Sequence, residues 1–209
     1  MDRVNNYLVQ AQLAKRHFLR YDQKALIEKL KLQADETFVY VKLLCKIYRL
    51  HRTTGDLERM EKEWVDANTH AEVMTILDLV CDSRPDRCLS GQWKSMASFG
   101  HMFHQDLLET RDPFAEAIEA DRDGFRQTCL SMGAEEISGG DMSFAVELFD
   151  GLSVAVQFWE GDEEFPPQVR WLWDSNALMY LKYETMYFAV GLLKSRILAG
   201  MTGKDPQHN

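Results

Sequence analysis

Apolar and polar residues alternate most clearly over residues 143–158. The apolar positions of this stretch are Phe144, Val146, Leu148, Leu152, Val154, Val156 and Phe158. Successive side chains of a strand point to opposite faces, so these residues share one face of two strands. Asp150-Gly151 separates the two runs and is typical of a tight hairpin turn. The pattern therefore predicts an antiparallel hairpin with one strongly apolar face, which has to be covered by helices.

Three further segments are rich in β-branched and aromatic residues, which strands favour. These segments are residues 38–41, 46–50 and 169–173. The turn residues Thr53-Thr54-Gly55-Asp56 follow the second segment, and Gly55 accepts a positive φ at little cost. We expect a second hairpin there, continuing through Leu57 to Trp64.

Four helical regions are predicted from apolar residues spaced three to five positions apart and from capping residues. Residues 3–32 are expected to form two helices, with Asp22 as the N-cap of the second. Asn68 or Thr69 begins a helix over residues 71–80, and Asp112-Pro113 begins another that runs to Gly133. Asp174-Ser175 is expected to cap the long C-terminal helix, residues 178–198, which ends near Gly200.

The order of these elements predicts an α+β fold rather than alternating βα units. We expect a single domain over residues 1–200, with an antiparallel β-sheet of about five or six strands packed against the N- and C-terminal helices. Residues 201–209 read as a flexible C-terminal tail. No internal repeat and no linker rich in Pro, Gly or Ser divides the chain.

The charge of the chain is acidic overall but basic near the N-terminus. The 209 residues carry 24 Lys and Arg against 33 Asp and Glu, a net charge of −9. This balance argues against a nucleic-acid partner, because such proteins need a dense basic face to neutralise phosphates. Residues 1–50 nevertheless contain ten basic and five acidic residues. Either the basic helices pack around an acidic body, or they form a surface for an anionic partner.

The N-terminus has no basic segment followed by an apolar run, so the sequence predicts no secretory signal. The most apolar helix is interrupted by charged residues and contains only nine uncharged residues in a row, from Thr185 to Leu193. A membrane span needs about 20 apolar residues. The four cysteines have no metal-binding or redox spacing. We therefore expect a cytoplasmic protein with reduced thiols and no membrane partner.

The loop after the second predicted hairpin strand contains the strongest candidates for ligand binding or catalysis in the sequence. Asp162, Glu163 and Glu164 are consecutive, and Asp162 and Glu164 would point the same way in an extended chain. Close carboxylates bind hard cations, or share one proton and act as acid or base. The competing interpretation is a solvated turn. Trp159, Asp162, Glu164 and Asp174 are candidate ligand-binding residues that we expect to cluster.

Two other segments contain candidate site residues. His101 and His104 would share one face of a helix, at a spacing that suits a metal ion, although surface or hydrogen-bonded histidines are the favoured interpretation. Trp93 lies in an irregular segment and is either a ligand contact or an anchoring aromatic. The sequence contains no phosphate-binding loop, no Rossmann fingerprint and no catalytic-triad motif, and it identifies no cofactor.

An apolar strand followed by Trp-x-Gly-Asp-Glu-Glu-Phe-Pro, residues 159–166, resembles a family of uncharacterised proteins. This family is a domain of unknown function common in anaerobic bacteria and archaea. Trp173-Asp174 and Gly91-Gln92-Trp93 fit the resemblance, which extends from about Tyr21 to Leu198. The resemblance implies no catalytic residue. Some relatives carry a cysteine-rich iron–sulfur module like that of corrinoid proteins, which this chain lacks, so it implies anaerobic metabolism only by analogy.

Two classes of function remain open. The first is a non-catalytic binding or accessory protein of anaerobic metabolism, with a small ligand or a protein as its partner. The second is a small enzyme, with or without a metal ion, that uses Asp162 and Glu164 of the acidic loop and Asp174 with a histidine. The first is favoured because no catalytic motif is present. The C-terminal helix is, in addition, a candidate interface of a homo-oligomer.

Overall fold

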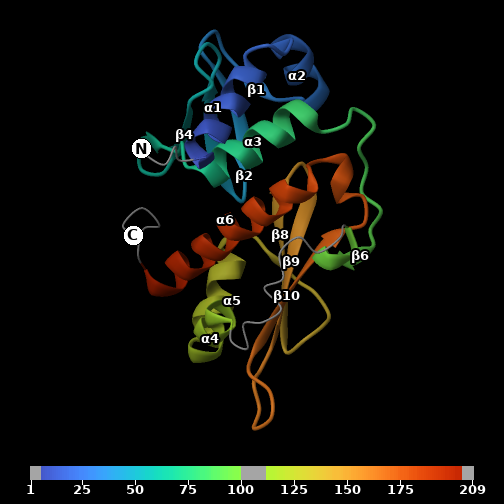
Figure 1. Ribbon diagram of the computed structural model, residues 1–209. Helices are drawn as coiled ribbons and strands as arrows, with labels where there is room; N and C mark the ends of the chain where they lie inside the picture. The colour runs from blue at the N-terminus through green and yellow to red at the C-terminus, as the bar shows by residue number, and fades with distance from the viewer. Residues whose placement is uncertain (1–5, 100–111, 204–209) are drawn as a thin grey trace. The chain divides into compact units, whose positions relative to one another are not determined.

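The computed structural model describes residues 6–99 and 112–203. These residues form six α-helices and ten β-strands in two antiparallel sheets, which confirms the predicted α+β class with helices at both ends. The contacts divide the chain into two compact units (Figure 1). The first unit combines Met1–Cys88 with Asn176–Ala189, and the second combines Leu89–Ser175 with Val190–Asn209.

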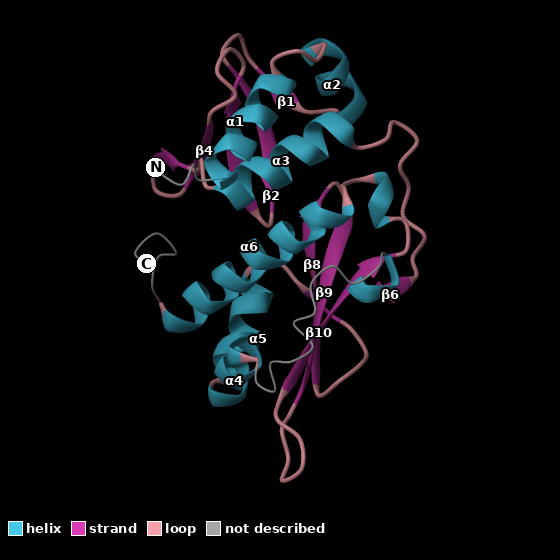
Figure 2. Cartoon of the chain, in the orientation of Figure 1, coloured by secondary structure: helices cyan, strands magenta, loops and turns pink. Residues whose placement is uncertain are grey.

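The first unit packs helices against a five-stranded meander. Its helices are α1 (Asn6–Phe18), α2 (Gln23–Leu30), α3 (His70–Asp82), the short 3-10 helix η2 (Ala177–Met179) and the beginning of α6 (Tyr183–Thr202). Its strands are β1 (Gln33–Ala34), β2 (Phe38–Leu43), β3 (Lys46–His51), β4 (Leu57–Met60) and β5 (Trp64–Asp66), hydrogen-bonded in chain order. Helices α1 and α3 lie side by side over one face of this sheet (Figure 2).

The predicted capping residues begin two of these helices. The Asp22 carboxylate accepts hydrogen bonds from the backbone N–H groups of Lys24 and Ala25 at the start of α2. The Thr69 hydroxyl accepts from the N–H of Glu72 in α3 and donates to the Glu72 carboxylate at 2.8 Å. These bonds satisfy N–H groups that have no partner within the helix.

A buried ion pair fastens α3 to the sheet of the first unit. The Arg59 guanidinium on β4 pairs with the Glu72 carboxylate on α3, and both side chains are almost fully buried. The Tyr48 hydroxyl on β3 donates to the same carboxylate at 3.0 Å. Removing one member of such a pair would leave an uncompensated buried charge, so the pair fixes the position of α3 on the sheet.

The second unit is built around the predicted hairpin. Its strands are β6 (Trp93–Ser95), β7 (Glu135–Glu136), β8 (Met142–Phe149), β9 (Leu152–Trp159) and β10 (Gln168–Asp174), in the order β6-β10-β9-β8-β7. Its helices are the 3-10 helix η1 (Met96–Phe99), α4 (Pro113–Ala120), α5 (Arg122–Ser131) and the rest of α6. Val146 pairs with Val154, and Asp150 and Gly151 both have a positive φ, as a tight hairpin turn requires.

The helix predicted from Asp112 to Gly133 is two helices. Asp112 caps α4 as expected, with Pro113 in its first turn. The helix ends at Asp121, whose carboxylate then accepts a hydrogen bond from the Gly124 N–H at 2.9 Å and begins α5. A Cβ at position 124 would collide with this carboxylate, so Gly124 permits the cap. The break follows because an aspartate that bonds the chain ahead of it competes with helix continuation.

The expected cap of the C-terminal helix is wrong. Asp174 is the last residue of β10, and α6 begins only at Tyr183, after the short 3-10 helix η2. Asp174 and the following residues matched the pattern of an N-cap, but the Asp174 carboxylate binds backbone N–H groups from a distant segment instead. At Asp174, hydrogen bonds to a distant segment therefore replace the local helix cap.

The strands divide into two five-stranded sheets, where the sequence suggested one sheet of five or six strands. The single domain over residues 1–200 stays a prediction, because the two contact units share α6. Of the predicted tail 201–209, α6 includes the first two residues, and residues 204–209 lie outside the described part of the chain.

Replacing Phe158 by Ala should lower the free energy of unfolding by about 3–5 kcal/mol, because Phe158 is fully buried in the second unit and its removal leaves a cavity. Denaturant titration measures this loss. Phe165, in the loop after β9, is 60% exposed and provides the control. Phe165→Ala should change stability little, and equal losses in both variants would contradict the assignment of the inner face.

Candidate functional site

The acidic loop has the geometry of a turn. One oxygen of Asp162 accepts hydrogen bonds from the backbone N–H groups of Glu164 and Phe165, at 2.8 and 2.7 Å. These bonds hold the pKa of the exposed Asp162 carboxyl below its usual value. Glu163 and Glu164 are exposed as well. Asp162 therefore folds its own loop, as aspartates in turns commonly do.

The predicted cluster of Trp159, Asp162, Glu164 and Asp174 does not form. Strands β9 and β10 are antiparallel, with Trp159 paired to Gln168 and Val154 paired to Trp173. The acidic loop therefore lies at one end of β10, and Asp174 lies at the other. The Arg170 guanidinium lies over the Trp159 ring, 4.8 Å from its centroid. The prediction that these four residues share one concave site is wrong.

Asp174 instead anchors the chain that leads into β6. It is almost fully buried, and its carboxylate accepts hydrogen bonds from the N–H groups of Ser90 and Gly91 and from the Ser90 hydroxyl. Strand β6 then pairs Trp93 with Asp174, and the Trp93 side chain is 41% exposed. The two motifs Gly91-Gln92-Trp93 and Trp173-Asp174 therefore meet through one carboxylate, whose role here is structural.

The predicted histidine site for a metal ion stays a prediction. His101 and His104 lie outside the described residues. Within residues 6–99 and 112–203, no group of three His, Cys, Asp or Glu side chains could hold a metal ion. All four cysteines are free thiols. Burial raises the pKa of Cys81 and of Cys129 to about 12, so both thiols stay protonated and are poor nucleophiles near neutral pH.

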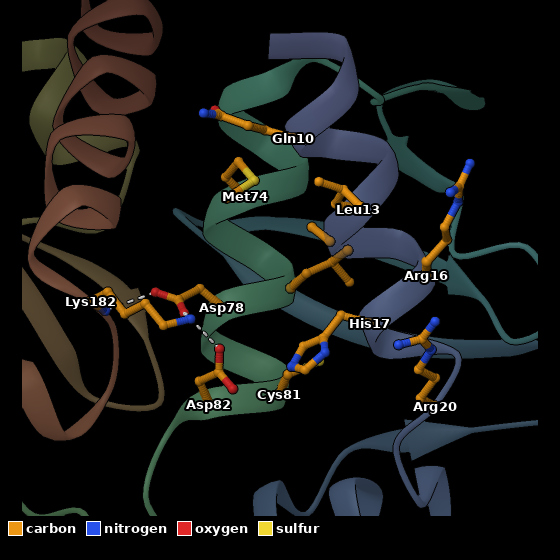
Figure 3. A pocket seen from close by; sticks show the side chains of 12 residues that line it. Gln10, Leu13, Arg16, His17, Arg20, Met74, Asp78, Cys81, Asp82 and Lys182 are labelled. Carbon is orange, nitrogen blue, oxygen red and sulfur yellow. Dashed lines mark hydrogen bonds and ion pairs between the residues drawn. The ribbon is translucent and has the colours of Figure 1, made fainter. Parts of the chain in front are cut away.

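A groove in the first unit was not predicted. It has a volume of about 480 Å³ and lies along α1 and α3, near the residue that precedes α6 (Figure 3). We call it the α1–α3 groove. Its lining residues are Gln10, Leu13, Ala14, Arg16, His17, Arg20, Met74, Leu77, Asp78, Cys81, Asp82 and Lys182. This volume falls in the range of small-molecule sites.

A buried lysine holds the α1 wall of the groove in place. The Lys15 ammonium group donates to Asp56 Oδ1 at 2.8 Å and to Asn68 Oδ1 at 2.7 Å. Asp56 ends the turn before β4, and Asn68 precedes α3. A Cβ built at Gly55 would lie 3.0 Å from the Lys15 Cβ, and Gly55 has φ +75°, so glycine is needed at this close approach.

A chain of polar contacts closes the opposite side of the groove. The Lys182 ammonium group forms ion pairs with Asp78, at 2.9 Å, and with Asp82 (Figure 3). The Lys182 backbone N–H also donates to Asp78 Oδ2 at 2.8 Å. Burial works against both charges, but these contacts outweigh it, so the pKa of Lys182 is raised and that of Asp82 is lowered.

Tyr21 continues this chain toward α1. Its hydroxyl donates to Asp82 Oδ1 at 2.7 Å, and His17 Nε2 lies 3.2 Å from the same hydroxyl oxygen. Since the Tyr21 proton is directed at Asp82, the oxygen accepts from His17, which therefore carries a hydrogen on Nε2. Burial and the hydrogen bond to Asp82 raise the pKa of Tyr21 to about 12.

The α1 side of the groove is basic. Arg16 and Arg20 are exposed, and neither has an acidic partner within the part of the chain that the structure describes. Leu13, on the same side of α1, is 55% exposed, although leucine is usually buried. An apolar surface beside unpaired guanidinium groups can bind a molecule with an apolar body and a negative charge.

Sequence reasoning missed the groove because its walls are far apart in the chain. Asp78 and Lys182, which form one wall, are separated by 104 residues. One signal was present: the excess of basic residues over residues 1–50 suggested a surface for an anionic partner. Of these cations, Arg16 and Arg20 line the groove, whereas Lys15 points inward to Asp56.

Residues 22–196 match a domain of unknown function, DUF3786, and the chain therefore belongs to this family. The match covers most of the chain and confirms the resemblance to an uncharacterised domain family. No curated protein and no solved structure is detectably similar to the chain. Within the described residues, no helix is long and apolar enough to span a bilayer.

Replacing Asp174 by Asn should lower the free energy of unfolding by about 2 kcal/mol, because the amide group turns an N–H donor toward donors that need an acceptor. Asp162→Asn is the matched control. An asparagine oxygen accepts the same turn hydrogen bonds, so this variant should leave stability almost unchanged. Thermal and denaturant unfolding measure both, and a larger loss for Asp162→Asn would refute the assignment.

Replacing Tyr21 by Phe should alter how stability depends on alkaline pH. The pKa of Tyr21 is raised from 10.0 to about 12, so the protonated hydroxyl stabilises the native state fully below pH 10. That contribution is lost as the pH rises from about 10 to about 12. The stability difference between wild type and Tyr21→Phe should therefore shrink over this interval. Urea titrations across the interval test this, and a constant difference would contradict the Tyr21–Asp82 hydrogen bond.

Proposed function

We propose that the protein is a non-catalytic binding or accessory protein that takes a small ligand in the α1–α3 groove. The observation that carries the proposal is the groove itself, which joins an apolar surface of Leu13, Ala14, Met74 and Leu77 to a rim of charged side chains. Small-molecule sites are concave, mostly apolar and contain a few placed polar groups. The groove meets this description within a single unit of the fold.

The state of the titratable groups favours binding over catalysis. A general acid or base works best when its pKa lies near the operating pH. Of the residues that line the groove, Asp82 has a lowered pKa and Lys182 a raised one, and the pKa of Tyr21, which donates to Asp82, is also raised. These three groups therefore keep one protonation state near neutral pH. They are suited to holding the groove in shape and not to transferring protons.

The alternative function, a metal-dependent enzyme at the acidic loop, has weaker support. An oxygen of Asp162 already accepts two backbone hydrogen bonds within its own loop. Asp174 lies at the opposite end of β10 and accepts hydrogen bonds from Ser90 and Gly91. A cation needs several carboxylate oxygens at one point, and the carboxylates of Asp162 and Asp174 do not converge.

The cellular setting of this function comes from the sequence. The resemblance supports a role in anaerobic metabolism, and four free thiols suit a reducing cytoplasm. The distribution of the family and its Trp-x-Gly-Asp-Glu-Glu-Phe-Pro motif, residues 159–166, belong to the same proposal. The absence of a nucleic-acid partner rests on the net charge of −9, and self-association through the C-terminal helix stays a prediction.

Leu13→Asp should weaken the binding of the fluorescent probe 1-anilinonaphthalene-8-sulfonate by about tenfold or more. The substitution removes a large apolar contact in the groove and adds a charge of the same sign as the probe. A fluorescence titration gives the dissociation constant. Leu8→Asp is the matched control, since Leu8 lies on the same helix, is 63% exposed and does not line the groove.

Leu8→Asp should bind the probe as the wild type does, and circular dichroism melting should show that both variants fold. A wild-type protein that binds no probe, or equal losses in the two variants, would refute a ligand site in the α1–α3 groove.

A further inference from the structure

We infer that the α1–α3 groove selects amphipathic monocarboxylates, with the carboxylate at Arg16 and Arg20 and the apolar body along Leu13 and Met74. This inference rests on the proposed function and specifies its ligand class. It combines three observations on the groove. Two guanidinium groups have no acidic partner among the described residues, the acidic side chains already have partners, and an exposed apolar surface lies between the arginines and the acidic residues.

The two arginines supply the recognition of the anion. Arg16 lies in the last turn of α1 and Arg20 in the turn that directly follows the helix, and both line the α1 side of the groove. Both are exposed and lack an acidic partner among residues 6–99 and 112–203. A guanidinium group offers two parallel N–H donors that match the two oxygens of a carboxylate. Lysines at these positions would provide charge without this geometry.

The acidic residues of the groove do not provide a competing site for a cation. Asp78 receives the Lys182 ammonium group at 2.9 Å and the Lys182 backbone N–H at 2.8 Å. Asp82 receives the same ammonium group and the Tyr21 hydroxyl. A cationic ligand would have to displace these donors from partly buried carboxylates. The charge available to a ligand is therefore positive, and it lies on the α1 side.

The apolar part of the groove fixes the kind of body that the ligand carries. Leu13 lies three residues before Arg16 and one turn beyond Gln10, and Figure 3 shows Leu13 and Met74 between the arginines and the Lys182 contacts. Ala14 and Leu77 extend this surface. A hydrocarbon chain or aromatic ring placed here removes Leu13 from water, which favours binding roughly in proportion to the apolar area buried.

Three probes of equal chain length and different charge test the inference. Octanoate, 1-octanol and octylammonium compete for the groove against 1-anilinonaphthalene-8-sulfonate, and the displacement curves give their affinities for the full chain. Octanoate should bind at least about tenfold more tightly than the other two, because only its head group is an anion that can form a bidentate ion pair with a guanidinium group.

The double variant Arg16→Gln/Arg20→Gln should reduce octanoate affinity about tenfold, to that of octanol, and leave octanol affinity unchanged. Because this variant also weakens the anionic probe, isothermal titration calorimetry measures octanoate and octanol binding to it directly. Lys24→Gln/Lys62→Gln is the matched control, since it removes the same charge from exposed positions outside the groove. This control should keep the full preference for octanoate.

The outcomes separate the inference from the proposed function. If octanol or octylammonium binds as tightly as octanoate, the groove is a ligand site but the selection of carboxylates is refuted. If neither 1-anilinonaphthalene-8-sulfonate nor any of the three octyl compounds binds, the proposed function fails as well. Binding to vesicles of phosphatidylglycerol, lost in Arg16→Gln/Arg20→Gln and without octanoate binding, would overturn the inference in favour of a membrane surface.

Discussion

The buried ammonium group of Lys15 is the interaction on which the α1–α3 groove depends. Burying a lysine charge is costly unless acceptors surround it, and here Asp56 and Asn68 both accept its hydrogens. One acceptor follows the turn at Gly55 and the other precedes α3, so the contact ties α1 to the sheet and to α3 together. Without this tie, Leu13, Arg16 and Arg20 would not be held beside Met74 and Asp78.

The same contact explains why the basic N-terminal region divides into two parts. Consecutive helical residues point about 100° apart, so Lys15 turns inward while Arg16 turns toward solvent. The inward cation is neutralised by Asp56, as expected for basic helices packed on an acidic body. Arg16 and Arg20 stay free of acidic partners within the described chain, as expected for an anion-binding surface. The two interpretations of the sequence therefore describe neighbouring residues of α1 and of the turn that follows it.

Local patterns in the sequence predicted the elements well, and tertiary contacts account for what they missed. The hairpin of β8 and β9 follows from the alternation of apolar residues and from the turn Asp150-Gly151. Asp22, Thr69 and Asp112 cap helices as predicted, because each side chain bonds to N–H groups only two or three residues further along the chain. Asp174 has the same local signature, yet Ser90 and Gly91 use its carboxylate, a contact across 84 and 83 residues. The groove was missed for the same reason, since Lys182 reaches Asp78 only in the folded chain.

The segment that matches the DUF3786 family contributes only one wall of the groove. The matched segment, residues 22–196, includes Asp78, Asp82 and Lys182, whose contacts hold the chain before α6 against α3. It does not include α1, which supplies Leu13 and Arg16, or the turn after α1, which supplies Arg20. The contacts that hold the Lys182 wall of the groove and the arginines that would bind the anion are therefore on different segments. The preference for an anion therefore has to be read from the side chains of α1 and of the turn that follows it in this chain.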